Sequence, residues 1–103
     1  MIREITAAEL HSKLEQGAGI NLIDVREPDE WEEGHISQAR SIPLSEFQAR
    51  EGEVHLEEGD VVIICRSGGR SGKVCEYMRL KGFDVVNVCD GMLAWPGTVV
   101  TGQ

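Results

Sequence analysis

The residues best suited to carry chemistry lie near the middle of the chain, in the segment Cys65-Arg66-Ser67-Gly68-Gly69-Arg70-Ser71. A cysteine becomes a strong nucleophile when its sulfur is a thiolate. Gly68 and Gly69 can adopt positive φ angles, which let successive backbone N–H groups turn inward and form an anion-binding nest. A helix predicted to start after the diglycine adds the positive end of its dipole. We therefore expect the nest, with Arg66 and Arg70 beside it, to lower the pKa of the Cys65 thiol and to stabilise a persulfide or an incoming anion.

A second interpretation of Cys65 is purely structural, because a cysteine at the end of an apolar run usually packs in a core. The glycine loop, the arginines and the helix start together favour the functional interpretation. The length of the loop also separates it from two other anion sites. Four residues lie between Cys65 and Arg70, whereas the cysteine phosphatase loop C-x5-R has five, so this bowl fits a single sulfur better than a phosphate. The segment around Gly72-Lys73 fails the ATP-binding pattern G-x-x-x-x-G-K-[ST], because Ser67 and Val74 occupy its first and last positions.

The remaining cysteines lack such a setting. Cys75 shares a predicted helix face with Val74 and Met78, which indicates core packing, whereas Cys89 ends a predicted strand and could serve as a resolving thiol at the same sheet edge. Neither the three cysteines nor the three histidines have the spacing of a zinc site, so we expect neither a metal nor another cofactor.

The elements that must position Cys65 alternate along the chain. Val61 to Ile64 is a continuous β-branched run, typical of a strand buried on both faces. The capping box Thr6-Ala7-Ala8-Glu9 predicts the start of the first helix. The pattern predicts strands at 2–5, 20–25, 39–43, 61–64 and 85–88, helices at 6–16, 28–33, 44–50, 71–80 and 92–95, and an acidic surface loop at 51–60. This alternation indicates an α/β fold with a mainly parallel sheet, in which ligands bind beyond the carboxyl ends of the strands.

Length and charge limit the class of protein. The 103 residues predict one domain over 1–103, and 41% are apolar, enough for a packed core. The longest apolar run has five residues, whereas a membrane span needs about 18, and an odd number of cysteines favours free thiols, so we expect a soluble cytoplasmic protein. The net charge is −8, yet residues 66–81 carry +4 and the remainder −12. A basic island in an acidic protein favours a small anionic ligand over nucleic acid.

Three blocks of the sequence, spread over residues 3–95, resemble the rhodanese-like, single-domain thiosulfate sulfurtransferases. The first is similar to the family pattern D-x-R…E-[aromatic]…G-H-I…A…I-P and consists of Asp24-Val25-Arg26-Glu27, Glu30-Trp31, Gly34-His35-Ile36, Ala39, Ile42 and Pro43. The second is the CRSGGRS loop, which resembles the family's active-site loop, and the third is Gly91-Met92 with Trp95. Gln38, Ser41 and Asp90 depart from the family pattern, and Asp90 could place a carboxylate near the sulfur.

The resemblance implies a three-layer α/β/α fold with a five-stranded sheet, and a double-displacement reaction. Cys65 would take the outer sulfur of a donor such as thiosulfate, and a thiophilic acceptor, cyanide or a thiol, would remove it. Residues 65–70 would form the cradle, in which Arg66 attracts the donor and Arg70 holds the loop or the anion. Behind the loop, we expect a structural set of ion pairs formed by Asp24, Arg26 and Glu30.

The other residues of the resemblance receive structural interpretations: His35 as a hydrogen-bonded packing residue, and Trp31 and Trp95 as core or loop-packing residues. Two further functions remain open at this point. A sulfur-relay or partner-binding module would use the same fold with little thiosulfate turnover, and would receive sulfur from a protein persulfide. A phosphatase or arsenate reductase would use the same cysteine, although the short loop disfavours it.

Overall fold

One parallel five-stranded sheet forms the centre of the computed structural model, which describes residues 2–54 and 59–102. Every neighbouring pair of strands is parallel. In spatial order across the sheet the strands are β1 (Arg3–Ile5), β5 (Val85–Val88), β4 (Asp60–Ile64), β2 (Ile20–Asp24) and β3 (Ala39–Ser41). The predicted α/β class and the mainly parallel sheet are confirmed.

Strand β4 occupies the middle of the sheet, as the apolar run predicted. Its last four residues are buried, because β2 and β5 pair with it and helical layers cover both faces. Ile64 lies opposite Asp24 of β2, and Ile63 lies opposite Asn87 of β5. The residue that follows β4 therefore emerges at the carboxyl edge of the sheet, between its two neighbours.

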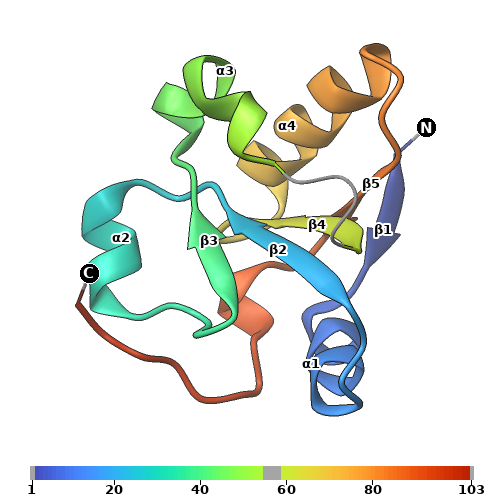
Figure 1. Ribbon diagram of the computed structural model, residues 1–103. Helices are drawn as coiled ribbons and strands as arrows, with labels where there is room; N and C mark the ends of the chain where they lie inside the picture. The colour runs from blue at the N-terminus through green and yellow to red at the C-terminus, as the bar shows by residue number, and fades with distance from the viewer. Residues whose placement is uncertain (1, 55–58, 103) are drawn as a thin grey trace.

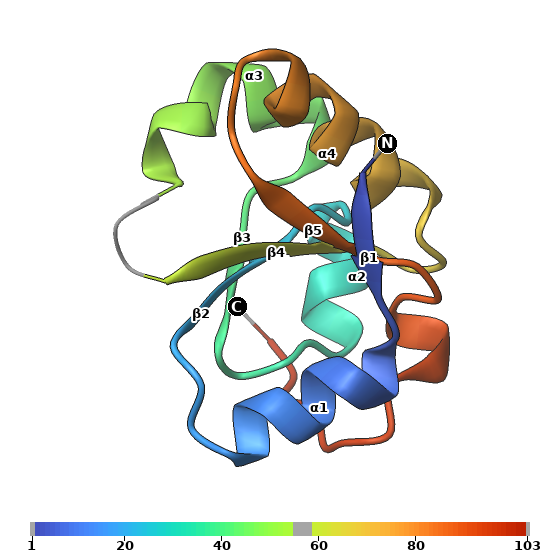
Figure 2. The same ribbon diagram turned by 90° about the vertical axis from the view of Figure 1, so that its right-hand side faces the viewer.

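Helices cover both faces of the sheet and make the three layers (Figures 1 and 2). On one face lie α3 (Phe47–Arg50) and α4 (Gly69–Leu80); on the other lie α1 (Ala7–Glu15) and the 3₁₀ turn η4 (Met92–Ala94). The remaining helical segments are α2 (Pro28–Glu33) and the 3₁₀ turns η1 (Leu44–Glu46) and η2 (Glu51–Glu53). The predicted capping box starts α1, where Thr6 accepts from the N–H of Glu9 and the Glu9 side chain accepts from the N–H of Thr6.

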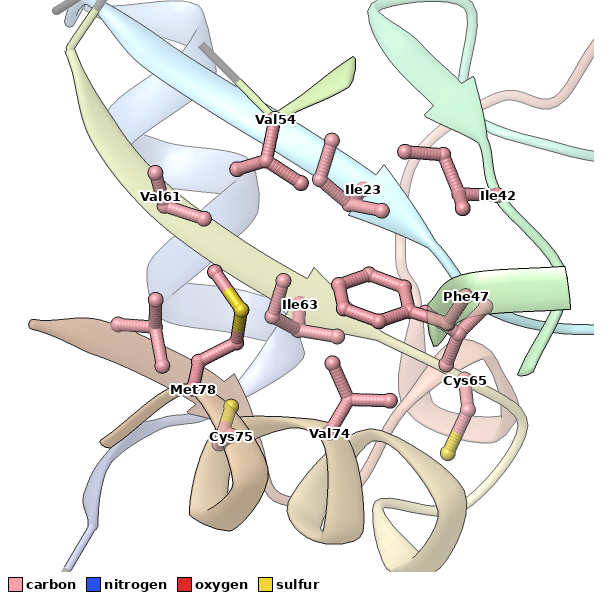
Figure 3. Close-up of a cluster of buried hydrophobic side chains, with 12 residues drawn as sticks. Ile23, Ile42, Phe47, Val54, Val61, Ile63, Cys65, Val74, Cys75 and Met78 are labelled. Carbon is pink, nitrogen blue, oxygen red and sulfur yellow. The ribbon is translucent and has the colours of Figure 1, made fainter. Parts of the chain in front are cut away.

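Two predictions of local structure were wrong. Helix α4 begins at Gly69 rather than Ser71, because the left-handed Gly68 already turns the chain into the helix. The surface loop predicted at 51–60 is replaced at its start by η2 and by Val54, which is buried in the core near Ile23 (Figure 3). The part of that loop at 55–58 lies outside the described residues. Within the described chain, no helix has the length and apolar character needed to cross a membrane.

Candidate active site

Cys65 follows β4 directly, and its side chain lies at the edge of the buried cluster and points towards the first turn of α4 (Figure 3). Its Sγ accepts a hydrogen bond from the backbone N–H of Gly68 at 3.1 Å, and the Oγ of Ser71 lies 3.2 Å away. The residue is only 1% exposed. The sulfur thus sits at the base of the loop, within hydrogen-bond distance of a backbone N–H and a hydroxyl.

Two opposing effects set the pKa of the Cys65 thiol. Burial raises it, because a low-dielectric environment disfavours the thiolate. Hydrogen bonds from the Ser71 hydroxyl and from the backbone N–H groups of Ser71, Gly68 and Ser67 lower it by more, so the pKa lies below its usual value. The predicted nest therefore acts through backbone amides and one hydroxyl that favour the anionic form of sulfur.

The shape of the loop depends on close contact with the segment that follows β5. Gly68 has a φ of +99°, and a Cβ there would lie 2.2 Å from the carbonyl oxygen of Cys89. The N–H groups of Met92 and Leu93 donate to the carbonyls of Cys65 and Arg66, at 2.9 and 3.0 Å. Because the N–H and C=O of one peptide point in opposite directions, these bonds turn the N–H groups of residues 66 and 67 away from η4.

A bidentate ion pair fixes the first turn of α4 to α2. The two terminal nitrogens of Arg70 donate to the two carboxylate oxygens of Glu30 at 2.6 and 2.8 Å. The hydrogen bonds from Arg70 lower the pKa of Glu30 to about 2, and the same bonds raise the pKa of Arg70 above its usual value. The Arg70 side chain is thus occupied by a protein carboxylate.

The other two residues of the expected ion-pair set form a separate pair. The Arg26 guanidinium binds both oxygens of Asp24, with the shortest contact at 2.8 Å, and both residues are buried. Arg26 also donates to the carbonyls of Glu30 at 3.3 Å and Gly34 at 2.8 Å. The pair therefore ties the end of β2 to helix α2, which in turn holds Arg70. The set predicted as one cluster divides into two linked pairs.

Arg66 is the charged residue of the loop that faces solvent. It is exposed, and within the described chain it forms no ion pair. It lines a surface cavity of about 330 Å³ beside the loop, together with Arg26, Glu30, Glu33, Met92 and Leu93. Its guanidinium is available to an anion that approaches the site.

The comparison with known proteins agrees with this geometry. Residues 6–97 match the family described as Rhodanese-like domain. The chain belongs to the rhodanese-like domain family. The resemblance seen in the three sequence blocks is therefore confirmed.

Several relatives of this rhodanese-like chain have names that refer to sulfur chemistry. "Putative sulfurtransferase YtwF" of Bacillus subtilis is 44% identical over 96 residues, covering 93% of this chain and 92% of the relative. "Sulfurtransferase" of Allochromatium vinosum is 35% identical over 92% of this chain and 89% of its own length. A crystal structure of a rhodanese-like domain protein from Staphylococcus aureus superposes with a TM-score of 0.88 at 33% identity, covering 99% of this chain and 100% of that one.

Two polar residues of this rhodanese-like site were missed by the sequence analysis. Ser71 ended the segment singled out for chemistry but was given no role of its own, yet its hydroxyl contacts Sγ. Asn87 of β5 hydrogen-bonds Ser71, and both side chains are buried. The signal for Asn87 was present, since it is the one polar residue in the buried run Val85-Val86-Asn87-Val88. Its position behind the loop could not be predicted without the order of the strands in the sheet.

Two further cysteines and one acidic residue that the sequence singled out have different surroundings in the rhodanese-like chain. Cys75 is 0% exposed in the core, and burial raises the pKa of its thiol to about 12. Cys89 is an exposed residue with a free thiol, and its backbone carbonyl packs on Gly68. Asp90 accepts from the N–H of Ala7 at 2.7 Å, so it caps α1 rather than facing the sulfur.

The aromatic residues of the family pattern are also in structural positions. His35 is buried, stacks on Trp31 with ring centroids 3.6 Å apart, and its Nδ1 donates to the Trp31 carbonyl. Trp95 packs against the α1 side of the sheet. In the described part of the chain, no group of three or more His, Cys, Asp and Glu side chains is arranged to hold a metal ion.

Proposed function

We propose that this protein is a sulfurtransferase that moves sulfane sulfur from a small anionic donor such as thiosulfate to a thiophilic acceptor, through a persulfide on Cys65. The observation that carries the proposal is the set of hydrogen-bond donors around Sγ, from Ser71, Gly68 and Ser67. Such donors favour a thiolate as the attacking group, and favour it again as the leaving group.

In the first step the Cys65 thiolate attacks the outer sulfur of thiosulfate. A new S–S bond forms to Cys65, the S–S bond of thiosulfate breaks, and sulfite leaves with the bonding electron pair. In the second step cyanide, or another thiophile, attacks the outer sulfur of the persulfide. The Cys65–sulfur bond breaks, thiocyanate leaves when cyanide is the acceptor, and the Cys65 thiolate is restored. No external oxidant or reductant is needed.

The loop residues divide the remaining tasks. Arg66, exposed and beside the 330 Å³ cavity, attracts the donor anion. Arg70, bound to Glu30, holds the shape of the loop. The 1% exposure of Cys65 favours a donor that presents a terminal sulfur on a narrow end. The cytoplasm is the proposed compartment, since the three cysteines are all free.

Intact-protein mass spectrometry tests this proposal. After exposure to thiosulfate the protein should gain the mass of one sulfur atom, and cyanide should remove it. Cys65→Ser should show no gain. Cys89→Ser, the same substitution at an exposed thiol, is the matched control and should load like the wild type, as should Cys75→Ser. Loading that persists in Cys65→Ser would refute Cys65 as the carrier.

A second candidate function is that of a sulfur-relay protein, and the name of one relative favours it. "Putative sulfur carrier protein YrkF" of Bacillus subtilis is 38% identical over 93% of this chain, and the match covers 52% of that protein. A relay protein would be loaded by a protein persulfide rather than by thiosulfate. Rapid loading by a protein persulfide, together with slow turnover of thiosulfate, would support the relay function over the thiosulfate sulfurtransferase.

A further inference from the structure

A chain of polar side chains runs behind Cys65, from the sulfur through the buried Ser71 and Asn87 to the exposed Glu4 on the edge strand β1. The Ser71 Oγ lies 3.2 Å from Cys65 Sγ and also within hydrogen-bond reach of Asn87 Oδ1. Ser71 is 0% exposed and Asn87 is 2% exposed, so both side chains are largely shielded from bulk water. A serine hydroxyl carries one proton and can donate to only one of these two acceptors at a time.

The orientation of the Asn87 amide is fixed by its other contacts. Its Nδ2 donates to the Glu4 carboxylate at 3.0 Å and to the Gly68 carbonyl at 3.2 Å. Both partners can only accept, so a flipped amide would place oxygen against oxygen at two points. The Oδ1 of Asn87 must therefore face Ser71, where it can only accept a proton.

We propose that Asn87 is a positioning residue that competes with the Cys65 sulfur for the single Ser71 proton, and thereby directs that proton to sulfur only when sulfur is anionic. In the thiol, Cys65 S–H donates to Ser71 Oγ, and Ser71 donates to Asn87. When Cys65 ionises, the Ser71 hydroxyl rotates and donates to the thiolate. The rotation leaves Asn87 Oδ1 without a donor, which is the cost of forming the thiolate.

The same competition operates during sulfur transfer, a step that rests on the function proposed above. In the persulfide the inner sulfur is neutral and has no proton, so Ser71 returns to Asn87. As an acceptor removes the outer sulfur, negative charge develops on Cys65 Sγ and Ser71 turns towards it. Asn87 thus accepts the Ser71 hydrogen bond while the inner sulfur carries no negative charge.

The charged and titratable groups near Cys65 do not provide this switch. Arg70 of α4 is bound by Glu30 of α2, Cys75 of α4 is a buried thiol, and Glu4 of β1 reaches the site only through Asn87. Arg66 faces the solvent. The hydroxyl of Ser71 is therefore the group whose direction can change with the charge on sulfur.

Opposite effects on the thiol distinguish competition from simple structural support. Ser71→Ala removes the donor to the thiolate and should raise the pKa of Cys65 by about one pH unit. Asn87→Leu removes the competing acceptor and should lower the pKa by about half a unit. If Asn87 only supported the loop, its loss would weaken the nest and raise the pKa.

Asn87→Leu leaves the former partners of the amide satisfied. The Gly68 carbonyl also accepts from the N–H of Gly72 at 3.0 Å, and Glu4 is exposed to water. Leucine is close to asparagine in shape and suits a buried strand, so the substitution isolates the loss of the acceptor.

The test is a pH titration of the Cys65 thiol in the absence of any sulfur donor. Ultraviolet absorbance of the thiolate monitors the titration, and Cys65→Ser serves as the blank. We expect a higher pKa in Ser71→Ala, a lower one in Asn87→Leu, and no effect of Asn87→Leu in the Ser71→Ala background. An unchanged or raised pKa in Asn87→Leu, or an effect that persists without Ser71, would overturn the proposal.

A second measurement on the unmodified sequence avoids the risk that a variant fails to fold. The side-chain amide resonances of Asn87 should shift as Cys65 titrates, and the shift should be absent in Ser71→Ala. If the chemical shifts of the Asn87 amide stay constant through the Cys65 titration, the proposed competition is refuted. Because neither measurement uses a sulfur donor, a failure of sulfur loading and a failure of this inference give different results.

Discussion

The ion pair between Glu30 and Arg70 gives a prediction of stability whose dependence on pH follows from the structure. Both oxygens of Glu30 bind Arg70, and one also accepts from the N–H of Glu27 at 3.1 Å. The pKa of Glu30 falls from 4.5 to about 2, mainly through the hydrogen bonds from Arg70. Glu30→Gln keeps the shape of the side chain but removes its charge, and should destabilise the fold near neutral pH.

The size of this effect follows from the shift and from the exposure of the pair. Lowering the pKa from 4.5 to about 2 corresponds to at most about 3.4 kcal/mol. The two side chains are 32% and 26% exposed, and solvent screens such pairs, so we expect roughly 1–2 kcal/mol. Because folding lowers this pKa, the stabilisation is complete above the unfolded value of 4.5 and is lost as pH falls towards 2.

Denaturant unfolding at several pH values measures the effect. The wild type should exceed Glu30→Gln by about 1–2 kcal/mol at neutral pH, and the difference should shrink steadily below pH 4.5. Glu33→Gln is the matched control, because Glu33 is exposed on the same helix and forms no ion pair with the described residues. A difference that stays constant down to the lowest pH, or that Glu33→Gln reproduces, would refute the reasoning.

Two other substitutions test how the segment after β5 holds its neighbours. Gly68→Ala should lower the free energy of unfolding by about 2 kcal/mol or more and abolish sulfur loading, because the new Cβ would meet the Cys89 carbonyl at a strained φ. Gly69→Ala is the control and should cost far less, because its Cβ meets nothing within 4 Å. Equal unfolding midpoints for the two variants would contradict this reasoning. Asp90→Ala should lower the free energy of unfolding by about 1 kcal/mol, because it removes the acceptor for the Ala7 N–H at the start of α1. The pKa of the Cys65 thiol should stay unchanged, and an altered pKa would place Asp90 at the sulfur.

Local signals made much of the fold predictable. The Thr6–Glu9 capping box, the β-branched run that forms β4 and the glycines that end helices each act within a few residues of the sequence. Their alternation indicated a parallel sheet, and a parallel sheet brings the residue after its central strand to the ligand-binding edge. The position of Cys65 and the glycine loop could therefore be predicted without knowledge of any long-range contact.

Some side-chain pairings could not be predicted in this way. Glu30 and Arg70 are 40 positions apart, and the two residues joined by the Asp90 cap of α1 are 83 apart. The sequence grouped Glu30 with Asp24 and Arg26, and left the carboxylate of Asp90 free to face the sulfur. Which carboxylate meets which donor depends on the order of the strands and on where α2 lies relative to the first turn of α4, and only the tertiary structure sets these.

The sequence by itself located the proposed nucleophile and the backbone that surrounds it, because both lie within the seven residues from Cys65 to Ser71. The tertiary structure decided which side chains lie behind the sulfur. Asn87 reaches Ser71 because β5 lies next to β4, and Glu4 reaches Asn87 because β1 lies next to β5. A hydrogen bond needs its two atoms within about 3 Å, and only the pairing of strands distant in sequence brings these groups that close.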